Sequence, residues 1–130
     1  MQHKTIAPAT ADLRGWIADV LHHTPLQHVA LIESHAGVLR GNHYHRETRQ
    51  WILVVRGMLK YWYQPVDGSE PAQSVIVGPC DLVETPPGEV HALEMLAATV
   101  FLAFADGVRG GPDYELDTVR VPSIVPGRQG

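Results

Sequence analysis

Hydrophobic and polar residues follow one another in short runs along most of this chain, and turn residues interrupt the runs at close intervals. Runs that are rich in β-branched and aliphatic residues and bounded by glycine or proline are typical of β-strands. Many short strands without a long helical stretch predict an all-β domain built as a sandwich or a barrel. The predicted strands are 28–35, 39–45, 50–56, 58–64, 74–77, 82–85, 90–96 and 99–105.

The segment 11–22 allows two interpretations. Its apolar residues also fit one face of a helix, but Gly15 would cost a helix roughly 1 kcal/mol relative to alanine. We therefore favour a turn that leads into a strand. The core candidates in this segment are Trp16, Ile17, Val20 and Leu21.

The chain is expected to form a single domain with two extensions. Residues 1–11 form a polar N-terminal arm that looks loose or could pair with the sheet of a partner subunit, and residues 12–106 form the barrel. Residues 107–130 are rich in glycine and proline, so we expect an extended C-terminal tail that packs outside the barrel and ends in disorder. The sequence contains no internal repeat.

Bulk properties exclude several classes of protein. A chain of 130 residues can bury a real core, and a net charge of −4 argues against a nucleic-acid or anionic-membrane surface. The single cysteine, Cys80, cannot form an internal disulfide, which fits a reducing compartment. No signal peptide is evident, and the most apolar run, 92–105, contains Glu94 and is too short to span a bilayer. We expect a soluble cytoplasmic protein.

The candidate chemistry centres on histidines. His43 and His45 are two residues apart, so both imidazoles lie on one face if this segment is a strand. His91 can join them from a second strand, and a sheet protein builds a metal site in this way.

The residues around these histidines resemble the two motifs of the cupin superfamily. The first motif is matched by Gly37, His43, His45, position 50 and Gly57, although Gln50 replaces the usual glutamate. The second motif is matched at Pro86, Gly88 and His91, whereas Cys80 stands in place of a glycine and Met95 in place of an asparagine.

This resemblance implies an all-β cupin fold, the double-stranded β-helix or jelly-roll barrel, and a homodimer. Together with Gln50, the histidines could hold one divalent transition metal, either Zn, Ni, Fe, Mn or Co. The proposed metal ligands are His43, His45, Gln50 and His91. Alternatively, these histidines are only hydrogen-bonded pocket residues. Glutamine brings no negative charge to a metal site, but some cupins use it at this position. Glu47 could serve as a metal ligand in place of Gln50, or it could be a solvated turn residue.

Further residues could line the pocket. Arg40 could bind a phosphate or carboxylate or lie on the surface, and His35 has a weaker claim to substrate binding. Tyr61 could be a catalytic acid and Tyr63 a substrate-binding residue, or both tyrosines could be core residues. His43, His45 and His91 are the candidates for a catalytic base.

The stretch from Arg40 to His45 is similar to that of cupins that act on nucleotide-linked sugars. The resemblance implies an isomerase or epimerase that moves a proton next to a carbonyl group of a sugar-like substrate. Two alternatives remain: a metal-dependent cupin dioxygenase, and a non-catalytic module that binds a carbohydrate or another small molecule.

Overall fold

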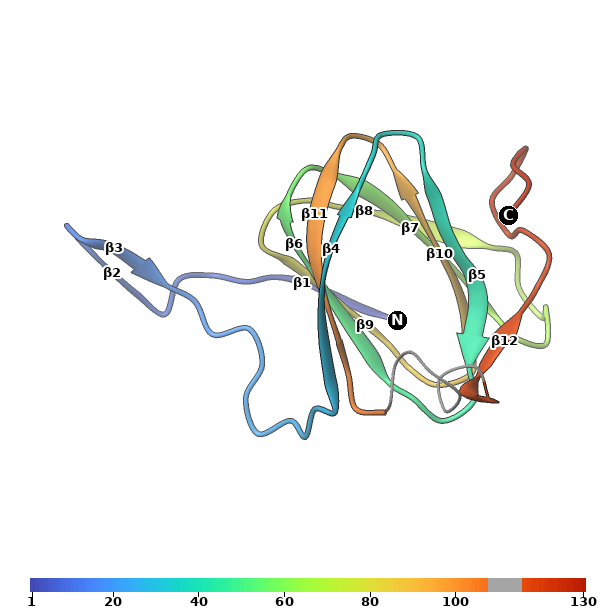
Figure 1. The fold of residues 1–130 in the computed structure, drawn as a ribbon, viewed down its shortest axis with the longest axis horizontal. Coiled ribbons are helices and arrows are strands. Elements are labelled where there is room, and N and C mark those ends of the chain that lie inside the picture. Colours follow the sequence, from blue (N-terminus) through green and yellow to red (C-terminus); the bar gives the residue numbers. More distant parts are fainter. Residues whose placement is uncertain (108–115) are drawn as a thin grey trace.

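The computed structural model describes residues 1–107 and 116–130, and every element named below lies in these ranges. Two antiparallel five-stranded sheets face each other around the core, and a two-stranded hairpin stands apart (Figure 1). The first sheet has the order β1-β9-β6-β11-β4 and the second the order β12-β5-β10-β7-β8. The strands are β1 (Gln2–Thr5), β2 (Thr10–Asp12), β3 (Gly15–Ile17), β4 (His28–Ser34), β5 (Leu39–His45), β6 (Gln50–Arg56), β7 (Leu59–Pro65), β8 (Gln73–Val77), β9 (Asp81–Thr85), β10 (Glu89–Met95), β11 (Thr99–Ala105) and β12 (Thr118–Arg120).

The predicted all-β, single-domain jelly roll is confirmed. All the predicted strands are present as β4 to β11, and their ends differ from the prediction by no more than one residue. Within the described ranges, no helix has both the length and the hydropathy needed to cross a bilayer.

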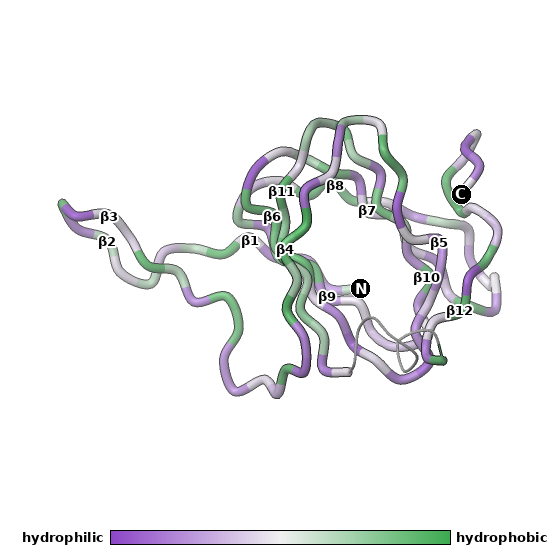
Figure 2. Tube along the Cα trace, viewed as in Figure 1, coloured by the Kyte–Doolittle hydropathy of each residue, from purple (hydrophilic) through white to green (hydrophobic). Residues whose placement is uncertain are grey.

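The core lies between the two sheets and follows from alternation along the strands. In β11, Phe101, Ala103 and Ala105 are buried, whereas the residues between them are partly exposed. Figure 2 shows hydrophobic residues gathered where β4, β11 and β6 run side by side. The inward residues of β11 pack with those of β6, β7 and β10, and full burial of a side chain such as Phe101 contributes roughly 1.5–3 kcal/mol.

The segment 11–22 contains a strand, as we favoured, but two of its core candidates are wrong. β2 and β3 form a hairpin that projects away from the barrel (Figure 1). Trp16 and Ile17 are therefore 57% and 65% exposed, because none of the described strands forms a second layer over the hairpin. Val20 and Leu21 do pack, against a cluster on the outer face of the first sheet that includes Trp51.

Both predicted extensions contact the barrel. β1 lies in the N-terminal arm and pairs with β9, so this part of the arm is held and not loose. In the tail, β12 pairs with β5, Val125 is buried, and Arg128 donates a hydrogen bond of 2.9 Å to the Gly37 carbonyl oxygen. These contacts order the end of the tail, where we expected disorder. The part of the predicted tail from 108 to 115 lies outside the described residues.

Gly57 permits the tight turn between β6 and β7. Its φ is +97°, and a Cβ built on it would collide with the Ala98 carbonyl oxygen and would lie 2.6 Å from the Thr99 hydroxyl oxygen. We expect Gly57→Ala to lower the free energy of unfolding by roughly 3 kcal/mol, because a steric clash adds to the cost of a left-handed backbone. Urea unfolding measures the change.

Gly68→Ala is the matched control. Gly68 has a φ of +67°, but a Cβ there would have open space around it. The free energy of unfolding of this variant should fall by only about 1 kcal/mol, which is the cost of the backbone conformation alone. Equal losses in the two variants would contradict the role assigned to the contact with Thr99.

Candidate active site

The structure brings the three predicted histidines together at one end of the barrel. His43 and His45 lie at the end of β5, and His91 in β10 pairs directly with His43. The candidate ligand nitrogens of the three rings all lie within 4.8 Å of one another. His45 and His91 are buried, whereas His43 is half-buried. A single metal ion or a single substrate group could therefore contact all three rings.

A bulge in β5 sets this arrangement. His91 faces His43, and Ala92 faces Gly41, so Asn42 is the additional residue between the two pairs. Gly41 has a φ of +93°, and a Cβ on it would lie 2.8 Å from the His91 carbonyl oxygen. Glycine is needed here because β10 passes so close to the backbone. The bulge also lets Arg40 and His43, three residues apart, line the same cavity.

Hydrogen bonds orient two of the rings. Nδ1 of His91 lies 3.1 Å from the Glu89 carbonyl oxygen. A carbonyl can only accept, so this contact places a proton on Nδ1 and leaves Nε2 of the neutral ring as an acceptor. Nδ1 of His45 lies 3.2 Å from the Thr118 hydroxyl oxygen. Neighbouring groups therefore fix both rings, an arrangement typical of metal ligands and of catalytic bases.

His43 and His91 border a cavity of about 60 Å³ inside the barrel. Its polar wall comes from both sheets, and its floor is apolar, which is the usual composition of a small-molecule site. Gln50 is buried on this wall and pairs with Thr85 of the neighbouring strand. The polar residues are Arg40, His43, Gln50, Tyr61, Thr85 and His91; the floor includes Ile32, Ile52, Leu93, Phe101 and Ala103.

Tyr61 is the most deeply buried of the polar residues in the cavity wall. Its hydroxyl shares a hydrogen bond with that of Thr85, and its ring stacks on His91 with centroids 6.2 Å apart. Burial raises the pKa of Tyr61 far above its ordinary value, the bond with Thr85 lowers it, and the nearby Glu89 raises it again. The net rise makes the phenol a weaker acid and keeps it neutral, so Tyr61 can donate a hydrogen bond into the cavity.

Of the two other predicted substrate-binding residues, Arg40 lines the cavity and Tyr63 does not. Arg40 lines the cavity, and its Nε donates a hydrogen bond of 2.5 Å to the Ser34 hydroxyl. Tyr63 is half-buried opposite His91, but its hydroxyl donates to Oε1 of Gln73 at 3.0 Å.

His35 does not belong to the site. Its side chain is exposed in the turn between β4 and β5 and is absent from the cavity wall. The strand ends at Ser34, which takes the inward position beside Arg40, and His35 therefore lies outside the cavity. Glu47 is also exposed, as expected for a solvated turn residue.

Sequence reasoning missed two residues that hold the histidines. Glu89 contacts His91 through its carbonyl oxygen, and its carboxylate binds the ammonium group of Met1 at 2.9 Å. Its place two residues before His91, within the second motif, was an available signal. Thr118 gave no signal, because it reaches His45 only through the return of the tail to β5.

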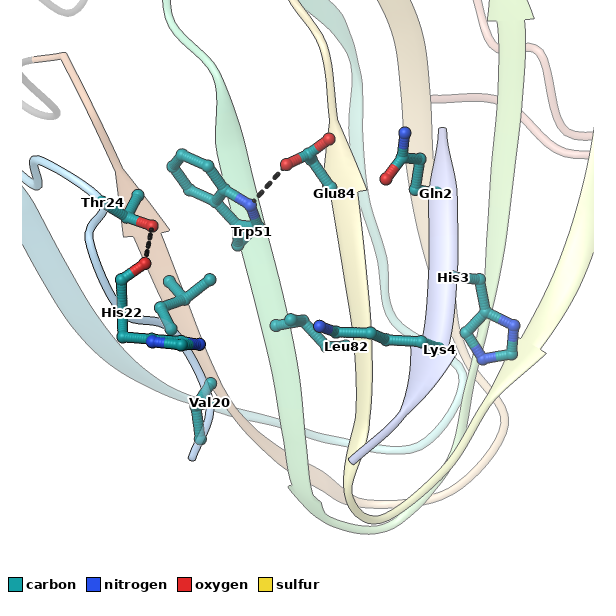
Figure 3. A pocket seen from close by; sticks show the side chains of 10 residues that line it. Gln2, His3, Lys4, Val20, His22, Thr24, Trp51, Leu82 and Glu84 are labelled. Carbon is teal, nitrogen blue, oxygen red and sulfur yellow. Dashed lines mark hydrogen bonds between the residues drawn. The ribbon is translucent and has the colours of Figure 1, made fainter. Parts of the chain in front are cut away.

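A second cavity, of about 310 Å³, lies on the outer face of the first sheet (Figure 3). Trp51 and Leu82 form its floor, and Nε1 of Trp51 donates a hydrogen bond of 2.8 Å to Glu84. Lys4 and His22 lie at its edges (Figure 3). None of the three site histidines lines it, so the two cavities are chemically separate.

Comparison with known proteins gives a family match over most of the chain. The profile of the polysaccharide biosynthesis C-terminal domain family matches residues 10–105. The chain is also 28% identical over 85 residues to UDP-2-acetamido-2,6-beta-L-arabino-hexul-4-ose reductase of Pseudomonas aeruginosa. That match covers 65% of this chain but only 23% of the reductase, so the chain spans less than a quarter of its relative.

Solved structures with a similar fold are cupin enzymes of nucleotide-linked sugars. A mutant of the 3,4-ketoisomerase QdtA of Thermoanaerobacterium thermosaccharolyticum, in complex with TDP-4-keto-6-deoxyglucose, has a TM-score of 0.76 at 15% identity, over 92% of this chain and 86% of that chain. The 3'-monoepimerase ChmJ of Streptomyces bikiniensis, in complex with dTDP-quinovose, has a TM-score of 0.80 at 17% identity. The match covers 95% of this chain and 70% of the epimerase chain. These likenesses show the cupin fold.

Proposed function

Because the chain belongs to the polysaccharide biosynthesis C-terminal domain family, we propose that it is an isomerase or epimerase of a sugar in nucleotide-linked form. The observation that carries the proposal is the convergence of His43, His91 and Tyr61 on one small cavity, with His45 grouped beside the other two histidines. The similar ketoisomerase and epimerase were both solved with a thymidine diphosphate sugar, which supports this class of substrate.

The chemistry is a proton transfer beside a carbonyl group. A neutral histidine takes the proton from the carbon next to the carbonyl, and the C–H electron pair moves to form an enediolate. Tyr61, whose hydroxyl is neutral, donates a hydrogen bond to the oxygen that gains the charge. To form an isomer, the proton is delivered to the former carbonyl carbon, the hydroxyl on the first carbon loses its proton and becomes the new carbonyl, and the former carbonyl oxygen takes up a proton. Return of the proton to the opposite face of the first carbon gives an epimer. No oxidant or reductant is needed.

Turnover of keto-sugars tests the proposal. The protein is incubated in D₂O with TDP-4-keto-6-deoxyglucose, and separately with a UDP-linked 4-keto-6-deoxy sugar, and deuterium incorporation is followed by NMR. We expect exchange of a proton next to the carbonyl, reduced about 10²–10⁴-fold in His45→Ala, since this is the usual contribution of a general base. Unchanged exchange in His45→Ala would contradict the proposal.

His35→Ala is the matched control, because this exposed histidine lies outside the cavity. It should leave exchange unchanged. If the folded parent protein exchanges no proton of either sugar, the chain is not the proposed enzyme. Oxygen uptake, or ligand binding without conversion, would then favour the dioxygenase or the binding module.

We also propose that His43, His45 and His91 hold one divalent transition metal, with Gln50 as an additional ligand. Three imidazole nitrogens within 4.8 Å of one another suit zinc, nickel, iron, manganese or cobalt, and the buried amide of Gln50 lines the same cavity. The metal would supply Lewis-acid stabilisation of the enediolate oxygen. Gln50 is a weaker partner for a cation than the glutamate common in cupins, because its side chain is neutral.

Elemental analysis of protein purified without added metal or a polyhistidine tag tests the metal site. About one transition metal per chain is expected in the parent protein and in His35→Ala, and a near-complete loss in His91→Ala. Gln50→Glu should bind the metal more tightly and become loaded at a lower total metal concentration, since a carboxylate attracts the cation. Metal-free parent protein, even after soaking, would refute the site and leave proton transfer to the histidines alone.

We further propose that the chain forms a homodimer in which the β2–β3 hairpin packs on the partner. An isolated two-stranded hairpin is marginally stable in water, and this one exposes Leu13, Trp16 and Ile17. Leu31 on edge strand β4 is also 72% exposed. Large apolar side chains left exposed in this way are typical of an interaction surface.

Sedimentation velocity tests the dimer. The parent protein should sediment as a dimer, whereas the double variant Trp16→Ser with Ile17→Ser should dissociate at least about tenfold more readily, because two large apolar side chains leave the interface. Val66→Ser, at an exposed position of the β7–β8 loop, is the control and should remain dimeric. A monomeric parent protein would contradict the proposal.

A further inference from the structure

Two hydroxyl groups meet inside the barrel, one from each sheet. Thr85 ends β9 of the first sheet, and Tyr61 lies in β7 of the second sheet. Both residues are buried, and both line the cavity beside His43 and His91. The two hydroxyl oxygens share a hydrogen bond. The orientation of the Tyr61 hydroxyl in the site is therefore coupled to Thr85.

Strand alternation turns Thr85 towards the cavity. In β9, Leu82 and Glu84 line the outer cavity, whereas Val83 belongs to the core between the sheets. Thr85 follows Val83 by two residues and so faces inward. A buried hydroxyl costs free energy unless it forms a hydrogen bond. In the described part of the chain, the Tyr61 hydroxyl is the partner that satisfies it.

The bond between the two hydroxyls uses one of their two protons. If Tyr61 is the donor, its proton points at Thr85 and is not available to a ligand. If Thr85 is the donor, the phenol oxygen accepts, and the Tyr61 proton is available to the cavity. A ligand oxygen that gains negative charge beside Tyr61 favours the second arrangement, because only then does Tyr61 donate a hydrogen bond to it.

A hydrogen bond accepted by the phenol oxygen also makes Tyr61 a stronger donor, because hydrogen bonds in a chain polarise one another. Burial raises the pKa of Tyr61, and the bond with Thr85 acts in the opposite direction. This direction is the one expected of a Thr85 hydroxyl that stabilises negative charge on the phenol oxygen. The Tyr61 hydroxyl remains neutral, but its proton is more strongly polarised towards an acceptor in the cavity.

We propose that Thr85 is a positioning residue for the proton transfer: its hydroxyl donates to the Tyr61 oxygen and directs the Tyr61 proton at the substrate oxygen that gains charge. Thr85 acts through Tyr61 and does not itself contact that oxygen. No covalent bond of either residue forms or breaks, so the pair is unchanged after turnover. The inference rests on the proposed function for the reaction, whereas the contact between the two hydroxyls is a feature of the fold.

A double-mutant cycle tests whether Thr85 acts through Tyr61. Deuterium exchange into TDP-4-keto-6-deoxyglucose and into a UDP-linked 4-keto-6-deoxy sugar is measured for the parent protein, Thr85→Val, Tyr61→Phe and the double variant. Thr85→Val keeps the branched shape of threonine and should lower kcat about 3- to 10-fold, as expected for the loss of one hydrogen bond. Tyr61→Phe should lower kcat about 10²–10³-fold, as for the loss of a donor to an oxyanion. In the Tyr61→Phe background, Thr85→Val should have no further effect, because the group through which it acts is already absent.

Two further readouts distinguish positioning from a general loss of structure. The KM for the sugar should be unchanged in Thr85→Val, because the bond to Tyr61 contributes when charge develops and not when the sugar binds. Thr85→Ser restores the hydroxyl and should recover most of the lost kcat. In protein labelled with carbon-13 at the tyrosine Cζ, the Tyr61 resonance should move in Thr85→Val and return towards its parent position in Thr85→Ser, with no sugar present.

Thr99→Val is the matched control. Thr99 is also buried, but it does not line the cavity, and its hydroxyl donates to the Ala97 carbonyl oxygen at 2.8 Å. This variant should be less stable in thermal unfolding but should retain the kcat and the Tyr61 resonance of the parent protein. Circular dichroism confirms that each variant is folded.

The outcomes separate this inference from the proposed function. Exchange that is equally fast in the parent protein and in Thr85→Val would overturn the role of Thr85 and leave the isomerase supported. Losses that multiply in the double variant would also overturn it, since Thr85 would then act on the substrate directly. A Tyr61 resonance that does not move in Thr85→Val would overturn the contact itself. If the parent protein exchanges neither sugar, the proposed function is refuted, and the role of Thr85 in it is refuted as well.

Discussion

The close approach of β10 to Gly41 is the constraint on which the site depends. At this point the His91 carbonyl lies where any larger residue would place its Cβ, and β5 accommodates the contact with a left-handed glycine and a bulge at Asn42. The bulge changes the alternation of β5 once. Before it Arg40 faces the cavity, and after it His43 does. Without the additional residue, a cation and an imidazole three positions apart would lie on opposite faces of the sheet.

The second constraint is that the rest of the barrel leaves little space. Phe101, Ile52 and Leu93 fill the barrel below the histidines, and the remaining polar groups come from the ends of several strands. Gln50 pairs with Thr85 within the first sheet, and Tyr61 of the second sheet shares a hydrogen bond with the Thr85 hydroxyl. The polar groups of the site are therefore held by strands, and strands position catalytic groups more accurately than loops do.

The sequence predicted what depends on local pattern. Alternation and turn residues located β4 to β11, and the spacing of His43, His45 and His91 indicated that these side chains meet. It could not predict contacts made by segments that return from elsewhere. Thr118 and Arg120 belong to a glycine- and proline-rich tail whose pairing with β5 has no periodic signal. The prediction for Trp16 was wrong for the opposite reason. Its hydrophobicity indicates burial, but within residues 1–107 and 116–130 no strand packs over the hairpin.

The pairing of β12 makes the tail a part of the site. Thr118 touches His45 only when β12 is docked, and Asn42 at the bulge accepts the backbone N–H of Ile124 at 2.9 Å. Site geometry and tail docking are therefore linked equilibria. A ligand that needs both binds with an affinity reduced by the undocked fraction, and in turn it slows hydrogen exchange in the tail as well as in the barrel.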